Sequence, residues 1–243
     1  MLNKALTICF GAYVALLSVF WAFVAGTLFV LPFAVLPRGR RERFTRFGAR
    51  LWFFGVVYGI VLARPRVHGR VDLAAGQGAL FVCNHRSFLD PPLLGAFTGS
   101  VGLSKRLIAL FPFIGLYGWL AGLVFVSRKS AAERRRARAE AVWLLSSGHR
   151  LFVFPEGTRS RDGHLRERVH LVLLKDAFEL GVPVVPCAVW DTEHAIPPGG
   201  LFARPLQEVH LHIGQALEPA NFTDAEVFTR AVWSAVASAL PTR

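Results

Sequence analysis

A histidine, an arginine and an aspartate follow directly behind an apolar run in the stretch FVCNHRSFLDPP, residues 81–92. His85 and Asp90 are five residues apart, and on a continuous helix this spacing turns two side chains away from each other. They can meet only if the chain turns between them, and an aspartate followed by a proline is a common start of a helix. A histidine at the end of a strand, with a carboxylate holding one ring nitrogen, can act as a general base.

Each member of this pair also has a purely structural interpretation. Asp90 can be a helix cap, and His85 can fix a loop through hydrogen bonds. No serine nucleophile elbow accompanies the pair, and no cysteine lies in polar surroundings. A catalytic pair would therefore activate a hydroxyl group of the substrate instead of a nucleophile of the enzyme.

A second polar cluster ends another apolar run, in LFVFPEGTRSRDG, residues 151–163. Gly157 permits a close approach to the backbone, Thr158 offers a hydroxyl, and Arg159 can bind a phosphate through two parallel hydrogen bonds. Glu156 precedes them, and taken alone these four residues are an ordinary turn. Because ligands of open α/β sheets bind outside the carboxyl ends of the strands, two such clusters together indicate a site.

The elements around these clusters follow the pattern of an α/β domain. Strands are predicted at residues 79–84, 122–127, 150–155, 182–190 and 208–214. The first four are continuously apolar, as expected where both faces of a sheet are covered. An amphipathic helix is predicted over 130–147, with Trp143 and Leu144 inward, and Thr223 with Glu226 forms a capping box for a last helix. We therefore expect one domain over residues 64–243, with a mostly parallel or mixed sheet flanked by helices.

The composition indicates a membrane surface before nucleic acid. The formal net charge is +12, hydrophobic residues make up 53% of the chain, and the mean hydropathy is +0.42. Nucleic-acid binders usually interleave basic and aromatic residues on a polar face, a pattern that is missing here. The three cysteines are odd in number and each lies among apolar residues, which predicts buried thiols in a reducing compartment (Cys9, Cys83 and Cys187).

The first 63 residues are expected to associate with a membrane. No charged residue occurs from Ala5 to Pro37, a run longer than the roughly 20 residues that cross a bilayer. Six arginines and one glutamate follow in residues 38–50, which favours the cytoplasmic side and contact with anionic headgroups. A second apolar stretch, residues 51–63, is short for a span. A membrane-embedded helical hairpin is favoured, with a single transmembrane helix as the alternative; the run is too long for a cleaved signal peptide.

Four blocks in order resemble the glycerolipid acyltransferases, in particular the 1-acyl-sn-glycerol-3-phosphate acyltransferase type. The blocks are NHRSFLD (84–90), GLVFVSR (122–128), FPEGTRS (154–160) and VPVVPCAV (182–189). Two positions depart from the family pattern. Ser127 stands where many members have an acidic residue, and Val169 stands where a glycine commonly follows a basic residue. Both departures lie in the presumed acceptor region, so they leave the acceptor headgroup open.

The resemblance implies a glycerol-3-phosphate acyltransferase-like fold and direct acyl transfer from acyl-CoA or acyl carrier protein to a lysophospholipid, with no metal and no further cofactor. His85 and Asp90 would be the catalytic pair, at the cytoplasmic face of the inner membrane. The implied substrate-binding residues are Lys105, Arg128, Glu156, Gly157, Thr158 and Arg159. The expected acceptor is 1-acyl-sn-glycerol-3-phosphate, which would give phosphatidic acid. The alternatives are another lyso-lipid such as lyso-ornithine lipid, or a membrane-anchored lipid-binding protein without turnover.

Two further patterns each have an ordinary structural alternative. His210 and His212 alternate on one face of a predicted strand and could bind metal, but a polar outer face is favoured because no third ligand follows. Residues 112–122, PFIGLYGWLAG, are apolar enough to line a groove for an acyl chain, although burial in the core is favoured.

Overall fold

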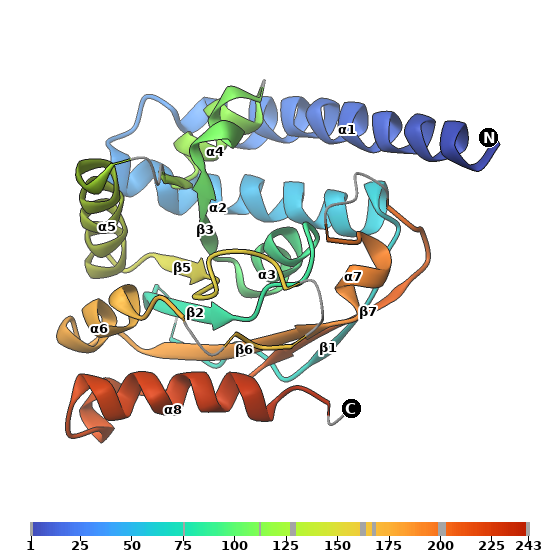
Figure 1. Cartoon of the computed structure of the whole chain (residues 1–243). Helices are drawn as coiled ribbons and strands as arrows, with labels where there is room; N and C mark the ends of the chain where they lie inside the picture. Colours follow the sequence, from blue (N-terminus) through green and yellow to red (C-terminus); the bar gives the residue numbers. More distant parts are fainter. Residues whose placement is uncertain are drawn as a thin grey trace.

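A seven-stranded mixed sheet forms the centre of the molecule, in the order β1-β7-β6-β2-β5-β3-β4 (Figure 1). The structure, a computed structural model, describes residues 2–74, 76–111, 113–126, 130–160, 164–166, 169–198 and 203–241. The strands are β1 Arg64–His68, β2 Ala79–Cys83, β3 Val101–Lys105, β4 Val124–Val126, β5 Arg150–Val153, β6 Val184–Trp190 and β7 Glu208–Ile213. All neighbours are parallel except β6 and β7, which are antiparallel. The predicted fold class is confirmed.

Strand β2 lies between β5 and β6, and all five of its residues are buried. Its side chains alternate between two hydrophobic cores, because successive residues of a strand point to opposite faces. Phe81 packs with the end of the N-terminal helical segment, including Val57 and Ile60. Leu80 packs on the other face with Leu174 and Phe228 from two helices. Each large buried side chain contributes about 1.5–3 kcal/mol, so this strand fixes the middle of the sheet.

Helices cover both faces of the sheet (Figure 1). They are α3 Asp90–Thr98, α4 Ile114–Leu120, α5 Ala131–Ser146, α6 Val172–Glu179, α7 Thr192–Ala195 and α8 Ala225–Ser238. Helix α5 begins where predicted, with Ser130 Oγ accepting a hydrogen bond from Glu133 N. Leu144 is buried as expected, whereas Trp143 is 40% exposed, so its predicted inward position is wrong. Helix α8 is capped by Asp224, and not by Thr223 as predicted.

The N-terminal segment is a helical hairpin. Helix α1, Leu2–Phe29, runs beside α2, Arg38–Phe54, which continues as a π-helical turn over Gly55–Ile60 (Figure 1). One stretch of α1, Gly11–Phe29, is long and apolar enough to cross a membrane, and 17% of it is buried. Arg41 and Arg50 hold the hairpin to the domain. Arg41 Nε donates to Leu120 O at 3.3 Å, and Arg50 Nε donates to Ala96 O at 2.7 Å.

Two strands and one thiol differ from the sequence predictions. Strand β1 was not predicted because it lies at the edge of the sheet, contains Pro65 and alternates between exposed and half-buried residues. Strand β3 was not predicted because it ends in the polar residues Ser104 and Lys105 and contains Gly102, where a Cβ atom would lie 2.1 Å from the ring of Phe152. Cys83 and Cys187 are buried neighbours on β2 and β6, but Cys9 is exposed, so that part of the prediction is wrong.

Candidate active site

The end of β2 is fixed by an asparagine that bridges two strands. Asn84 is buried, its Nδ2 donates to Val189 O at 2.8 Å, and its Oδ1 accepts from Val189 N at 2.8 Å. These two hydrogen bonds join the ends of β2 and β6 and set where the chain leaves the sheet. Sequence analysis assigned no role to Asn84. A polar amide directly behind a fully buried strand was the available signal, since such a group must find partners.

The loop after β2 brings His85 and Asp90 together, as predicted. His85 Nδ1 lies 2.8 Å from Asp90 Oδ2. The same oxygen accepts hydrogen bonds from Arg86 N at 2.6 Å and Ser87 N at 2.7 Å. Asp90 is fully buried and makes no capping hydrogen bond to α3, so the interpretation of Asp90 as a helix cap is wrong. Its carboxylate instead folds the loop back onto the histidine ring.

The ring of His85 lies flat on Phe154. The centroids are 4.1 Å apart and the planes differ by 16°. With Nδ1 directed to Asp90, the other nitrogen, Nε2, is on the opposite edge of the ring, and the side chain is 16% exposed. A histidine held on one face and at one nitrogen presents the second nitrogen in a defined direction. Phe154 was part of a matched sequence block, but its contact with the histidine was not predicted.

The second cluster holds the backbone of the first. Glu156 Oε1 accepts a hydrogen bond from His85 N at 3.2 Å, and Ser160 N donates to His85 O at 2.8 Å. Three successive amides, those of residues 85–87, therefore donate to carboxylates. The loops after β2 and β5 meet because these two parallel strands are neighbours and end at the same edge of the sheet.

Glu156 has an unusual acidity for a glutamate. Its side chain is buried, and this burial raises its pKa from 4.5 to about 7. The hydrogen bond from His85 N and the charge of Arg166 act in the opposite direction and lower the pKa, but they do not offset the burial. Near neutral pH this carboxyl group therefore exchanges a proton while it holds the backbone of the loop after β2.

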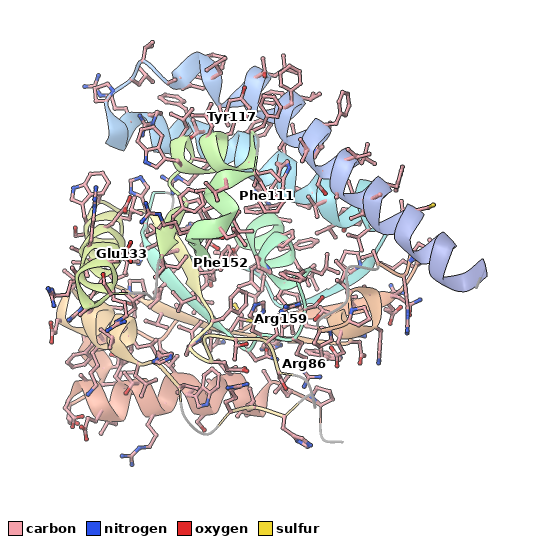
Figure 2. The ribbon with its side chains drawn as sticks, turned by 45° about the horizontal axis from the view of Figure 1, so that its top comes forward. Arg86, Phe111, Tyr117, Glu133, Phe152 and Arg159 are labelled. Atoms are coloured by element: carbon pink, nitrogen blue, oxygen red, sulfur yellow. The ribbon has the colours of Figure 1, made fainter. Side chains whose placement is uncertain are left out.

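The remaining residues of the second cluster lie closer to solvent. Gly157 has φ +68°, a left-handed conformation that favours glycine, and Thr158 is exposed. The guanidinium carbon of Arg159, which Figure 2 labels, lies 3.6 Å from the ring centroid of Phe88, so side chains of the two loops stack on each other. Arg86, also labelled in Figure 2, pairs with Glu193 Oε1 at 3.0 Å and ties the first loop to the region of α7.

The structure describes the remaining predicted substrate-binding residues only in part. Lys105 is the last residue of β3, paired in register with Val126 of β4, and the structure does not describe its side chain. Arg128 and Ser127 lie outside the described residues. Val169 is half-buried and precedes His170, whose backbone N donates to Pro155 O at 2.8 Å. The structure thus brings His85, Asp90, Glu156 and Arg159 to one place and leaves the role of Arg128 a prediction.

A possible metal-ligand group within the described parts of the chain lies at α7. The ligand atoms of Asp191, Glu193 and His194 lie within 4.8 Å of one another. Glu193 already pairs with Arg86, and exposed acidic groups are common without an ion. His210 and His212 form the partly exposed outer face that the sequence analysis favoured, where His210 stacks on Trp190 with 4.8 Å between centroids.

Comparison with known proteins decides the family. The acyltransferase family model matches residues 64–190, which include β1 to β6 and both polar clusters. The chain belongs to the acyltransferase family. A member of this family with known structure, the 1-acyl-sn-glycerophosphate (LPA) acyltransferase PlsC from Thermotoga maritima, superposes with a TM-score of 0.80 over 99% of both chains at 26% identity. The resemblance inferred from the four sequence blocks is thereby confirmed.

Curated relatives in the acyltransferase family differ in the acceptor that their names state. A lyso-ornithine lipid O-acyltransferase of Pseudomonas aeruginosa is 32% identical over 157 residues, 65% of this chain and 57% of the relative. The chloroplastic 1-acyl-sn-glycerol-3-phosphate acyltransferase LPAT1 of Arabidopsis thaliana is 30% identical over 217 residues, 86% of this chain and 58% of the relative. The chain spans somewhat more than half the length of these two acyltransferases.

Proposed function

We propose that this protein is a lysophospholipid O-acyltransferase. It would transfer a fatty acyl group from acyl-CoA or acyl carrier protein to the free hydroxyl of 1-acyl-sn-glycerol-3-phosphate, giving phosphatidic acid. The observation that carries the proposal is the 2.8 Å contact between His85 Nδ1 and the buried Asp90 carboxylate, with Nε2 on the opposite edge of the ring. A protein that only binds lipid has no chemical need for this arrangement.

The transfer begins with a proton. His85 Nε2 takes the proton of the acceptor hydroxyl as the oxygen attacks the carbonyl carbon of the thioester, and Asp90 stabilises the imidazolium that forms. The tetrahedral intermediate then collapses with cleavage of the C–S bond. The thiolate leaves and receives the same proton from the imidazolium. One oxygen–carbon bond forms, one carbon–sulfur bond breaks, and the histidine ends in its starting state.

The phosphate of the acceptor needs cationic partners beside the base. Arg159 contacts Phe88, which lies in the same loop after β2 as His85. The guanidinium group of Arg159 is therefore next to the loop that carries His85. Guanidinium groups bind phosphate through two parallel hydrogen bonds. We assign binding of the phosphate to Arg159 together with Arg128 and Lys105. The backbone of Gly157 and the hydroxyl of Thr158 would contact the adjoining glycerol. Glu156 would brace the loop.

A second acceptor is supported by one relative. The lyso-ornithine lipid acyltransferase matches this chain at 32% identity, and Val169 and Ser127 depart from the pattern common to phosphatidate-forming members. A lyso-lipid whose headgroup lacks a phosphate would make less use of the cluster around Arg159. The acceptor headgroup is therefore the point on which the assay must discriminate.

We further propose that residues 1–63 anchor the enzyme at the cytoplasmic face of the inner membrane while residues 64–243 form the acyltransferase domain. Helix α1 runs along α2, and α2 packs on the domain, so α1 lies across the top of the molecule in Figure 1. Its side chains are largely unburied, including Leu16 and Phe20. An apolar helix that lies beside an arginine-rich helix is suited to one leaflet, next to an acceptor and a product that are both lipids.

The direct test is an acceptor and donor screen with the purified full-length protein. Lysophosphatidate and lyso-ornithine lipid are each offered with labelled acyl-CoA and acyl carrier protein, and the products are separated by chromatography. Turnover with lysophosphatidate that disappears in His85→Ala supports the proposal. Turnover with lyso-ornithine lipid alone transfers the assignment to the second acceptor, and absence of turnover with every pair contradicts acyl transfer.

A further inference from the structure

The connection from β3 to β4, residues 106–123, has an apolar surface that the fold leaves uncovered. It consists of a 3₁₀ turn, Arg106–Leu110, and helix α4. The sequence favoured core burial of residues 112–122, yet Leu116 and Trp119 of that stretch are 54% and 49% exposed. Just before it, three more apolar side chains are exposed (Leu107 64%, Leu110 76% and Phe111 45%). The prediction of core burial is therefore wrong for this side of the segment. Contiguous exposed apolar side chains of this number mark an interaction surface.

The opposite side of the 106–123 segment is fixed on the hairpin. Tyr117 and Leu120 are buried against Val30 in a small separate core, and the Tyr117 hydroxyl lies 3.0 Å from Thr27 Oγ1. Gly26 permits this contact, because a Cβ atom there would lie 1.8 Å from the Tyr117 ring. The segment therefore has one orientation, and its exposed apolar side chains are directed away from the domain.

These side chains continue the apolar surface of α1. The ring of Phe113 packs edge-on against Phe23 of α1, with centroids 4.9 Å apart. Phe20, Phe23 and Leu28 of α1 are themselves 58%, 43% and 60% exposed. Figure 1 shows α4 beside α1 on the side of the sheet remote from α8, and Figure 2 shows Phe111 and Tyr117 in this layer.

Positive charge borders this joint surface. Arg40 of α2 is exposed. The Arg106 side chain at the start of the segment is 71% exposed, pairs with Glu133 of α5 at 2.7 Å, and lines a hollow together with Trp119 and Arg136. Arg41 lies over the ring of Trp119, with its guanidinium carbon 5.1 Å from the centroid. Apolar side chains bordered by arginines complement acyl chains beneath anionic headgroups.

We infer that residues 106–123 insert into the same anionic leaflet as α1 and form a second, separate membrane contact. Two contacts fix the tilt of the domain, which one helix cannot do. They also set the depth of the end of β3, where Lys105 immediately precedes the inserted segment. The inference rests on the membrane association proposed above for α1, and it does not require acyl transfer.

The depth of the segment can be measured with spin labels on single cysteines. The full chain carries Cys9→Ser, which removes the exposed thiol, while Cys83 and Cys187 are buried and unreactive. Labels are placed at Leu110 and Leu116, at Phe20 of α1 as the inserted reference, and at Val227 of α8, an apolar residue that is 45% exposed on the opposite layer. The protein is bound to vesicles of phosphatidylcholine and phosphatidylglycerol.

The expected result is that labels at positions 110 and 116 collide with oxygen and are shielded from a water-soluble nickel chelate, as at position 20. The label at position 227 should show the reverse. Labels at 110 and 116 that behave like the one at 227 overturn the inference. Dipolar broadening between labels at position 110 of two copies, at high dilution in lipid, also overturns it, because a second copy would then cover this surface.

A functional comparison separates this inference from the proposed activity. In the double variant Leu110→Ser, Leu116→Ser, turnover of a long-chain acceptor in vesicles should fall about fivefold or more, since an apolar contact with the leaflet is lost. Turnover of a short-chain acceptor in solution should change less than twofold, and Val227→Ser should change neither. Equal losses with both acceptors contradict the inference. If no variant or wild-type protein turns over any acceptor, the proposed function fails and the label depths still decide the insertion.

Discussion

The loop after β2, residues 84–90, and the loop after β5, residues 154–160, lie against each other but are held in different ways. In the first loop Asn84 and Asp90 are buried, and their hydrogen bonds fix the strand end and the backbone. In the second loop Thr158 is exposed, and Arg159 rests on Phe88, a side chain that is itself 51% exposed. One loop is fixed by buried hydrogen bonds, and the tip of the other is held by a contact near the surface.

This difference matches two different tasks. A general base must present one nitrogen in one direction, and a misplacement of about 1 Å can cost 10²-fold in rate. A phosphate ligand enters and leaves in each cycle, so its cationic partners need contacts that can be exchanged. Substitutions in the first loop should therefore lower kcat, whereas substitutions at the tip of the second loop should mainly raise KM.

The largest effect is expected for His85→Ala. Loss of the base should lower kcat by about 10³–10⁴-fold with little change in KM for the acceptor. The measurement is steady-state acylation with a circular dichroism spectrum to show that the fold is kept. His194→Ala, at a side chain that is 57% exposed, is the matched control and should stay within about twofold of the wild type. Turnover of a folded His85→Ala protein near the wild-type level would refute the assignment of the base.

Asp90→Asn should follow, with kcat lowered by about 10²–10³-fold. The amide keeps the size of the side chain and one acceptor oxygen for the backbone, but it no longer stabilises the imidazolium or fixes the tautomer of His85. Two readouts distinguish this from a general loosening of the loop: the melting temperature and KM should both change little. A large fall in melting temperature with kcat retained would show that Asp90 acts only on the fold.

Glu156→Gln should change how stability depends on pH. Burial raises the pKa of Glu156 to about 7, so between pH 4.5 and 7 the folded protein keeps a proton that the unfolded chain releases. Its contribution to stability is complete below about pH 4.5 and is lost as the pH rises through about 7. The shift of about 2.5 pKa units corresponds to a loss on the order of 3 kcal/mol.

The measurement for Glu156 is chemical unfolding at pH 4.5, 6 and 8. The amide retains an oxygen for His85 N, so the variant is the matched comparison, and the wild type should lose more stability than Glu156→Gln across this range. Parallel curves for the two proteins would mean that the carboxyl group titrates normally. Glu156 would then behave like the exposed side chains of the second loop and not like a buried one.

The smallest effect is expected for Arg159. Arg159→Ala should raise KM for a phosphate-bearing acceptor by about tenfold, the equivalent of one charge-assisted hydrogen bond, with kcat lowered less than threefold. Arg159→Lys should recover part of the loss. Lyso-ornithine lipid, which lacks the phosphate, should show no such rise in KM. If Arg159→Ala lowered kcat and left KM unchanged, Arg159 would act like the residues of the first loop, which position the base.

Much of the framework follows from apolar runs in the sequence. Strands β2, β4, β5 and β6 begin and end within two residues of their predicted bounds, because continuously apolar segments bounded by polar residues have few other interpretations. Strand β7 does so as well, through its alternation of polar and apolar residues. Strands β1 and β3 were missed because an edge strand with a proline, and a strand with a glycine and a polar end, carry little signal of their own. Their pairing with β7 and β5 decides their structure.

Part of the candidate site could also be predicted from local features of the sequence. The contact between His85 and Asp90 could be inferred, because only five residues separate them and the chain must turn. The positions of Phe154 beneath the ring and of Glu156 at His85 N depend on parallel pairing of β2 with β5, which lies about 70 residues away. The bridge from Asn84 to Val189 spans 105 residues. The spacing of nearby residues therefore indicates the chemistry, whereas the pairing of strands distant in sequence sets the orientation of the side chains.

The hydrogen bonds between Asn84 and Val189 also set the order in which the working enzyme can arise during its synthesis. The base and its carboxylate are translated early, but the strand end that positions them is completed only when residue 189 has left the ribosome and β6 has joined β2. With α1 anchored in a bilayer as proposed, a nascent chain would still lack a finished reaction centre. It would then reach the membrane before it could modify the lipids there.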